Sequence, residues 1–237
     1  MKILGIDTTA DVCSVGIADG DKLVCELYLH DKNTHSINLM TLIDDSLKLC
    51  GLNFDDIDAY AINVGPGSFT GIRIGVCTIK GFALENGKPC IEVNTLDCLA
   101  ENAYGFSGTI CPMIDARRCE SYYAFYRAKK DSIKRMSDYG ADKLEYFLAD
   151  LPEGDVCFVG DGAVNYKDFI IEQMGDRAFF LNEADMFQSA RGVLKIAVKK
   201  AEQKEFISAY DIMPYYHKKS QAEQIKEKNK GKNNWMF

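Results

Sequence analysis

The 237-residue chain has few of the residues that usually mark a catalytic or metal centre. It contains three histidines, one tryptophan and five prolines. No Walker lysine motif and no His-Glu-x-x-His pair is present, so P-loop phosphate binding and zinc proteolysis lack their minimum parts. His30 and His35 are five residues apart, which is the wrong spacing for one helical face. We therefore predict no metal site.

The chain also lacks an apolar run long enough to cross a membrane. Met1–Asp7 is typical of a first β-strand and not of a secretory signal. The nine cysteines are an odd number, lie in apolar segments and form no Cys-x-x-Cys pair, which indicates small buried side chains in a reducing compartment. We expect a cytoplasmic protein without disulfides and without membrane contact.

Charge is distributed unevenly along the chain. Six lysines against two glutamates give residues 217–237 a charge of +4, which leaves −11 for the rest of a chain whose formal net charge is −7. The acidic body disfavours contact with nucleic acid. The basic tail fits two interpretations, a flexible solvated end or a segment that touches nucleic acid.

The most informative segment is the glycine-rich run from Val64 to Gly75. Ile57–Val64 before it is typical of a buried strand, Gly65-Pro66-Gly67 forms a turn, and Ser68 or Thr70 can cap a following helix. A strand, a glycine turn and a helix N-terminus can bind an anion through free backbone N–H groups. The same pattern also makes a tight strand-to-helix connection.

The helix after this turn has one face with little side-chain bulk. At 100° per residue, that face carries Gly71, Gly75, Thr78 and Phe82. Each interior glycine costs about 1 kcal/mol relative to alanine, so we expect another backbone to approach closely. We predict that this bare face docks on a second helix, either of this chain or of another subunit.

The helix expected over Ser36–Cys50 is apolar over about half of its circumference. Its apolar positions are Leu39, Met40, Leu42, Ile43, Leu47, Leu49 and Cys50. This width predicts burial on two fronts, one against the sheet of its own lobe and one against a partner helix. A helix sunk deep in one core would show the same pattern. His35 is interpreted as a helix-start or interface residue.

The order of predicted elements repeats in the two halves of the chain. In the first half we expect strands at Lys2–Asp7, Val12–Ala18, Lys22–Leu29, Ile57–Val64 and Pro89–Val93, and helices over Ser36–Cys50, over Thr70–Glu85 and from Thr95. In the second half we expect strands at Thr109–Asp115, Glu120–Ala128, Ser132–Met136, Asp155–Val159 and Ala178–Leu181, and helices over Asp142–Ala149, Tyr166–Met174 and Ala184–Gln203. The order predicts a duplicated βββαβαβα fold with a nucleotide-sized cleft between two α/β lobes.

The predicted lobes comprise residues 1–104 and 105–216, followed by the tail 217–237. The last helix of the second lobe can also pack back on the first. The two halves share their strand ends: Ile6–Thr9 corresponds to Ile114–Arg117, and Gly65–Gly67 corresponds to Gly160–Gly162.

Four segments together resemble the TsaB (YeaZ) family over nearly the whole chain to about Glu223. They are Ile6–Thr9, Gly65–Gly75, Asp115–Arg118 and Pro214–Glu223. The resemblance implies an actin-, Hsp70- and sugar-kinase-like (ASKHA) α/β fold. It also implies a non-catalytic paralogue of TsaD, the subunit that transfers a threonylcarbamoyl group to N6 of the adenosine beside the anticodon in ANN-decoding tRNAs.

The resemblance further implies partners. A TsaB-like chain docks on TsaD through the helices Ser36–Cys50 and Thr70–Glu85, helps to recruit the ATPase TsaE, and meets tRNA only through the complex. No cofactor is expected on this chain alone, although ATP or ADP could bind at the subunit junction. We also expect a homodimer when the partner is absent, because both copies carry the same stripe. The candidate interface residues are His35, Leu39, Met40, Ile43, Leu47, Gly71, Arg73, Gly75, Thr78 and Phe82.

An independent actin-like ATPase or small-molecule kinase is the alternative function. Asp7 and Asp115 end equivalent strands, where actin-like ATPases place carboxylates linked to Mg²⁺. Both aspartates can instead cap turns, and Arg117 could hold a phosphate or a carboxylate. The candidate nucleotide or anion residues, possibly vestigial, are Asp7, Thr8, Thr9, Gly65, Gly67, Asp115 and Arg117.

Overall fold

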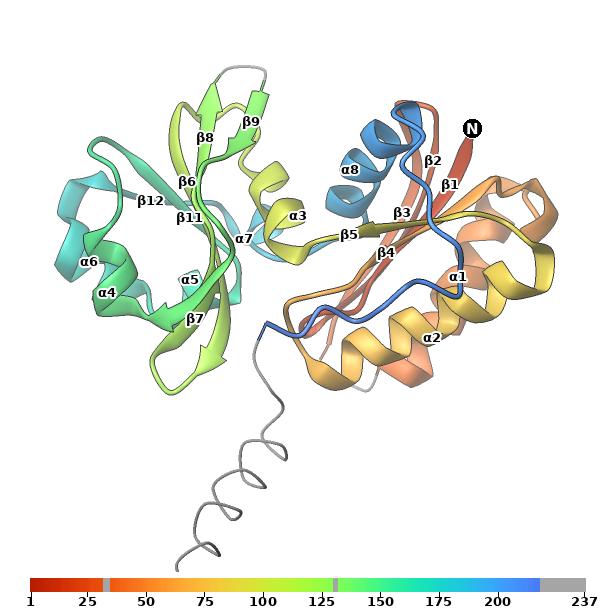
Figure 1. Ribbon diagram of the computed structural model, residues 1–237, viewed down its shortest axis with the longest axis horizontal. Coiled ribbons are helices and arrows are strands. Elements are labelled where there is room, and N and C mark those ends of the chain that lie inside the picture. Colours follow the sequence, from red (N-terminus) through yellow and green to blue (C-terminus); the bar gives the residue numbers. More distant parts are fainter. Residues whose placement is uncertain (32–34, 130–131, 218–237) are drawn as a thin grey trace, which may run out of the picture.

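Two β-sheets define the two lobes of the protein (Figure 1). The computed structural model describes residues 1–31, 35–129 and 132–217. The first sheet has the order β3-β2-β1-β4-β5. Its strands are β1 (Lys2–Asp7), β2 (Val12–Asp19), β3 (Lys22–His30), β4 (Ala59–Asn63) and β5 (Cys90–Val93). Strands β1, β4 and β5 are parallel, and β2 is antiparallel to both of its neighbours.

Helices cover both faces of the first sheet. Helices α1 (His35–Cys50) and α2 (Phe69–Asn86) cover one face, and α8 (Ala190–Glu202) packs on the other (Figure 1). Because both faces are covered, β4 is buried along its whole length and has a continuous apolar sequence instead of an alternating one. A short 3₁₀ turn over Phe54–Asp56 leads from α1 to β4.

The second sheet has the order β10-β7-β6-β11-β12, with β8 paired to β6 and β9 paired to β8. Its strands are β6 (Gly108–Arg117), β7 (Glu120–Tyr123), β8 (Tyr126–Lys129), β9 (Ser132–Arg135), β10 (Gly140–Lys143), β11 (Val156–Val159) and β12 (Ala178–Phe180). Helix α3 (Thr95–Asn102) lies between β5 and β6 in the sequence. The helices that follow are α4 (Leu144–Ala149), α5 (Asp161–Asn165), α6 (Lys167–Met174) and α7 (Glu183–Met186), with a 3₁₀ turn over Gly175–Arg177.

The two lobes exchange helices. Helix α3 follows the first sheet in sequence, yet Leu96 and Leu99 lie in the core of the second lobe. Helix α8 follows the second sheet, yet Val193 and Leu194 lie in a core built on the first sheet. The two helices therefore lie between the sheets and pack on each other (Figure 1).

The sequence boundary at residue 104 consequently does not separate the packing units. Helix α3 belongs with the second sheet, and the chain from α8 onward belongs with the first. After α8, Ile207 exchanges backbone hydrogen bonds with Cys90 of β5 at 2.9 Å, and Ile212 is buried in the core under α1 and α2. Of the predicted tail 217–237, residues 218–237 lie outside the described residues.

The predicted strand Glu120–Ala128 is two strands, β7 and β8. Both pair with β6 in a single antiparallel register, in which Ala124 would stand opposite Pro112. Proline has no N–H to donate to the ladder. The backbone of Phe125 instead accepts a hydrogen bond from Met136 N and donates one to Ser137 Oγ. The interruption thus follows from one proline in the neighbouring strand.

Two further predictions of helix and strand boundaries were wrong, and one helix was missed. The helix expected from Asp142 begins at Leu144, because Gly140–Lys143 pairs with β7 as strand β10. The helix expected over Ala184–Gln203 is two helices, since Ser189 caps α8 by accepting a hydrogen bond from Gly192 N at 3.4 Å. The short helix α5 was not predicted.

Phe158 tests the core of the second lobe, because it is fully buried on β11. Replacing a buried phenylalanine by alanine removes apolar contact and leaves a cavity, so we expect Phe158→Ala to lower the free energy of unfolding by about 3 to 5 kcal/mol. Phe179 on the adjacent strand β12 is 43% exposed, and Phe179→Ala should cost about 1 kcal/mol or less. Urea unfolding measures both, and equal losses would show that the core does not lie where described.

Candidate functional site

The turn after β1 packs directly on helix α2. The Thr8 hydroxyl donates to the carbonyl oxygen of Gly71 at 2.7 Å, and Ser68 N donates to the carbonyl oxygen of Thr9 at 2.6 Å. A Cβ at Gly71 would overlap the carbonyl oxygen of Thr8, and one at Gly75 would lie 2.5 Å from Thr8 Oγ1. Gly71 and Gly75 are therefore required by the close approach of the turn after β1.

This contact corrects the prediction of a bare docking face. Gly71 and Gly75 are buried inside the first lobe. Gly71 faces the backbone at Thr8, Gly75 faces the side chains of Thr8 and Ile62, and neither faces the backbone of a second helix. On the same side, Phe82 is partly buried and packs against Phe54 in a tilted arrangement, with ring centroids 4.6 Å apart. Thr78 donates its hydroxyl to Ile74 O within the helix.

The apolar stripe of α1 is also a core surface. Leu39, Ile43 and Leu47 are at most 4% exposed and pack with β1, β2 and α2. These three predicted interface residues are therefore not available to a partner in this conformation. His35 begins α1 and its Nε2 lies 2.6 Å from the carbonyl oxygen of Ala10, so it contributes to the packing of the same strand end.

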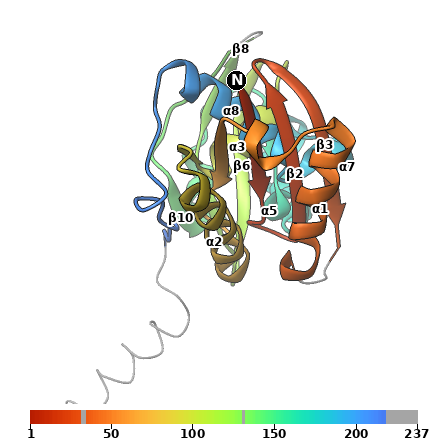
Figure 2. The ribbon, with the colours of Figure 1, turned by 90° about the vertical axis from the view of Figure 1, so that its right-hand side faces the viewer.

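Other apolar residues of the two helices are exposed. Ile37, Met40 and Leu49 of α1 are 70%, 50% and 72% exposed, and Leu84 of α2 is 46% exposed. Helices α1 and α2 lie side by side on the outer face of the first lobe (Figure 2). We call the exposed side of α1 around Ile37 and Met40, together with Leu84 and the exposed Arg73 of α2, the α1–α2 surface. Leu49 is nine residues from Met40 and therefore points to the opposite side of α1.

The chain end described by the structure closes over the first turn of α2. Tyr216 stacks on Phe69 with ring centroids 4.0 Å apart. Arg73 Nε donates to the Tyr216 hydroxyl at 2.8 Å, and its guanidinium lies 4.7 Å from the centre of the Phe69 ring. This aromatic and cationic cluster holds the segment that leads to the basic tail beside the α1–α2 surface.

Asp7 is completely buried and its carboxylate is fully engaged. Its Oδ1 accepts hydrogen bonds from the backbone N and the hydroxyl of Thr9 at 2.9 and 2.7 Å, and its Oδ2 accepts one from Asn63 Nδ2 at 2.6 Å. Asn63 Oδ1 in turn accepts a hydrogen bond from the Thr95 hydroxyl at 2.7 Å. Burial raises the pKa of Asp7, and the hydrogen bonds from Thr9 and Asn63 oppose that shift.

This network joins β1 and β4 of the first lobe to the start of α3, the helix that packs with the second sheet. The arrangement around Asp7 is a closed turn cap, because both carboxylate oxygens face protein donors. The residues at this strand end do not fit a Mg²⁺ ion with a bound nucleotide. Sequence reasoning did not identify Asn63 and Thr95 as parts of this site. Asn63 is the last residue of β4, the strand that runs parallel to β1.

Asp115 caps the equivalent turn in the second lobe. Its Oδ1 accepts hydrogen bonds from Arg117 N at 2.7 Å and from the Tyr166 hydroxyl at 2.8 Å. Arg117, the last residue of β6 before the turn to β7, has a positive φ of 66°. Asp161, which lies beside Asp115, accepts hydrogen bonds from Asp115 N and Gly162 N at 3.2 and 2.9 Å. Burial raises the pKa of Asp161 to about 7.

The candidate anion residues lie at two strand ends, one in each lobe. Asp7, Thr8, Thr9, Gly65 and Gly67 surround the β1 end, where Gly67 packs on the carbonyl oxygen of Thr9. Asp115 and Arg117 lie on the second lobe. Within the described ranges, no group of three or more His, Cys, Asp or Glu residues could hold a metal ion.

The cysteines are all unpaired thiols. Five are buried as predicted, and burial raises the pKa of one of them, Cys13, to about 11. Cys77 and Cys119 are exposed, so the expectation of buried side chains was wrong for these two. No helix among the described residues is long and apolar enough to cross a membrane.

The parallel strands β1–β4–β5 and β6–β11–β12, with their helices and the two matched strand ends, define a duplicated two-lobed α/β protein of the actin-like class. Solved structures support this class. "YeaZ from Pseudomonas aeruginosa" has a TM-score of 0.79 at 25% identity and covers 91% of this chain and 99% of its own. The (R)-2-hydroxyglutaryl-CoA dehydratase component A from Acidaminococcus fermentans shares the fold at a TM-score of 0.51 and 13% identity, covering 85% and 99%.

The chain belongs to the TsaD family, because the family model described as "TsaD: tRNA N6-adenosine threonylcarbamoyltransferase" matches residues 29–226. The tRNA threonylcarbamoyladenosine biosynthesis protein TsaB of Bacillus subtilis is 29% identical over 225 residues, covering 94% of this chain and 96% of that protein. The resemblance to TsaB (YeaZ) and the ASKHA fold expected from it are confirmed.

Gly71→Ala tests the contact between α2 and β1. The added Cβ would meet a backbone oxygen that cannot rotate away, so we expect the free energy of unfolding to fall by at least about 2 kcal/mol. Gly81 lies in the same helix with nothing within 4 Å of its Cβ position, and Gly81→Ala should raise stability by about 1 kcal/mol through helix propensity. Urea unfolding of the two variants measures both changes in the free energy of unfolding. Two stabilising alanines would contradict the described packing.

Asp161 should make stability depend on pH. Because its folded pKa of about 7 lies above the unfolded value of 3.8, the native state holds a proton that the unfolded state has lost between these pH values. Stability therefore falls as pH rises through this window, by about 1 to 2 kcal/mol between pH 5 and pH 8.

Asp161→Asn removes this titration while its amide oxygen can still accept both hydrogen bonds. We expect a smaller fall in the free energy of unfolding between pH 5 and pH 8 than in the unmodified protein. Asp168→Asn, an exposed change on α6, is the control for altered net charge. If the two variants show the same pH dependence, Asp161 is not the group responsible.

Proposed function

We propose that the chain is a non-catalytic scaffold and activator subunit in the installation of the threonylcarbamoyl group on tRNA. Its direct partner is a TsaD-family transferase. The relationship to TsaB over 94% of the chain supports this role. The observation that carries the non-catalytic part is Asp7, whose carboxylate is buried and bonded to Thr9 and Asn63.

The α1–α2 surface is the proposed docking site for the transferase. Ile37 and Met40 are large apolar side chains, both 50% exposed or more, on one side of α1, and neighbouring exposed apolar residues are typical of an interaction site. Met40 is unbranched and adapts to an irregular partner surface. Arg73 adds a planar cation whose direction is held by Tyr216, and arginine and aromatic residues are enriched among the side chains that dominate interfaces.

The proposed interface therefore differs from the first sequence prediction. Met40 and Arg73 remain in it as direct contacts. His35, Leu39, Ile43, Leu47, Gly71, Gly75, Thr78 and Phe82 act as the internal support that sets the direction of the two helices.

The remaining parts of the proposal concern the assembly. The pair formed with the transferase recruits a TsaE-like ATPase, ATP or ADP binds at the subunit junction, and tRNA is reached through the complex. In the absence of the transferase, two copies associate through the same exposed apolar side chains. The alternative of an independent ATPase or kinase has less support, because Asp7 and Asp115 both cap turns.

A double substitution on α1 tests the docking proposal. Ile37→Asp with Met40→Asp places two charges on the α1–α2 surface, and both positions are exposed enough for folding to be little affected. We expect at least about a tenfold loss of affinity for the TsaD-family transferase of the same organism, measured by isothermal titration calorimetry.

Tyr146→Asp provides the matched control, because Tyr146 is 56% exposed on α4 of the second lobe. This control should bind the transferase as the unmodified protein does. Equal affinity of the double variant and the control would refute docking through this surface. Turnover of ATP by the isolated chain, lost in Asp7→Ala, would instead support the alternative function.

A further inference from the structure

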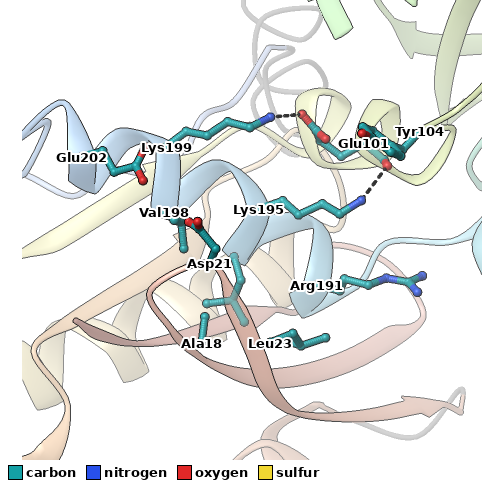
Figure 3. Close-up of a pocket in the computed structure, with 11 residues that line it drawn as sticks. Ala18, Asp21, Leu23, Glu101, Tyr104, Arg191, Lys195, Val198, Lys199 and Glu202 are labelled. Atoms are coloured by element: carbon teal, nitrogen blue, oxygen red, sulfur yellow. Dashed lines mark hydrogen bonds and ion pairs between the residues drawn. The ribbon is translucent and has the colours of Figure 1, made fainter. Parts of the chain in front are cut away.

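A cleft of about 480 Å³ opens where α8 meets the end of α3 and the β2–β3 hairpin (Figure 3). Its volume lies within the range of small-molecule sites, which often form between domains. It lies on the α8 side of the first sheet, opposite α1 and α2 (Figure 1). The cleft is therefore independent of the α1–α2 surface, and sequence reasoning did not find it.

The floor of the cleft is apolar and its wall is cationic. The floor consists of Ala18, Leu23, Leu194 and Val198. The wall comes from α8, on which Arg191, Lys195 and Lys199 recur every four residues and so share one side of the helix. This spacing is the signal that the sequence offered. Such a combination of apolar floor and convergent cations suits a small molecule with an apolar body and an acidic group.

The three cations differ in how they are engaged. Arg191 pairs with Asp185 at 2.9 Å, and Lys199 pairs with the Glu101 carboxylate at 2.8 Å. Lys195 forms no ion pair within the part of the chain that the structure describes. Its ammonium donates to the backbone oxygen of Glu101 at 3.2 Å and lies 5.3 Å from the Tyr104 ring centre.

Lys195 is thus an exposed cation whose ammonium is hydrogen-bonded to a neutral backbone group. Partial desolvation lowers the pKa of Lys195, and the nearby charges of Arg191 and Lys199 act in the same direction, while Glu101 and Asp185 oppose them. An anion that entered the cleft would pair with this ammonium. The side chain points across the cleft toward Glu101 and Tyr104 (Figure 3).

We propose that the cleft binds a small organic carboxylate with an apolar body. The carboxylate pairs with Lys195, and the body packs on Leu23, Leu194 and Val198 with one edge against Tyr104. Asp21 and Glu202 at the lining disfavour a doubly charged phosphate and favour an acid with a single charge. Since Tyr104 follows α3 and the floor belongs to the first lobe, the ligand bridges the two lobes.

Titration of the full-length protein with 4-phenylbutyrate, followed by two-dimensional NMR, tests the proposal. The matched ligand is the primary amide of the same acid, which has the same shape without the charge. We expect saturable binding of the acid that shifts signals of cleft residues, and at least about tenfold weaker binding of the amide. Lack of saturation at about 10 mM acid, or equal affinity for acid and amide, would overturn the proposal.

Lys195→Met removes the cation and keeps an unbranched side chain. It should weaken binding of the acid by about tenfold and leave the weak binding of the amide unchanged. Lys200→Met is the matched control, because Lys200 is on the same helix and donates to the backbone oxygen of Glu92 at 3.0 Å outside the cleft. Equal effects of these two variants would refute a role for Lys195.

Leu23→Glu is a second variant that does not depend on α8. Leu23 is 39% exposed near the edge of the first sheet, so the change is compatible with folding and places a negative charge on the floor. Leu23→Glu should weaken binding of the acid by about tenfold or more, and binding of the neutral amide much less. Unchanged binding of the acid would place its site outside this cleft.

Discussion

The direction of α2 depends on a backbone contact at the end of β1. Gly71 and Gly75 lack the side chains that would keep the helix away from Thr8, and the Thr8 hydroxyl bonds to the helix itself. The same strand end carries Asp7, whose hydrogen bonds reach β4 through Asn63. One close contact therefore positions the carboxylate network on the inside and the exposed residues of α2 on the outside. Gly71 and Gly75 thus influence the exposed side of α2 indirectly, because their contact with Thr8 on the buried side sets the orientation of the helix.

A second constraint joins the lobes. Because α3 and α8 pack on each other between the sheets and each contributes to the core of the other lobe, neither sheet is complete without a segment from the other half of the sequence. The cleft with Lys195 forms at this same junction. The exchange of α3 and α8 between the lobes therefore accounts both for the packing of the two cores and for the cleft.

The sequence predicted the order of most elements because apolar periodicity and turn residues are local signals. It also predicted that the glycines of α2 face another backbone. It could not identify that backbone, since an apolar or bare helical face looks the same whether it meets its own sheet or a partner. Leu39 and Ile43 were assigned to the interface for this reason, and the exposed Ile37 was overlooked.

Other differences arose from partners distant in sequence. Pro112 divides the strand opposite it, and only the pairing register reveals which residues stand across from a proline. Ser189 was a readable cap signal inside an apparently continuous helix. The engagement of Asp7 by Asn63 depends on two strand ends that lie 56 residues apart. The four-residue spacing of Arg191, Lys195 and Lys199 is a local signal, but it does not reveal that α3 and a hairpin complete the cleft.

The return of α8 to the first sheet has a consequence for synthesis on the ribosome. Gly5 and Gly16, on the two first strands, have space only for hydrogen where Leu194 covers them. Until residues near 194 have emerged, the inner face of β1 and β2 stays without its cover, and the later strand segment at Ile207 has not yet joined β5. The first lobe is therefore synthesised first, but it completes its packing only near the end of translation. Its nascent apolar face must be shielded during most of translation, either by transient contacts of the growing chain or by cellular chaperones.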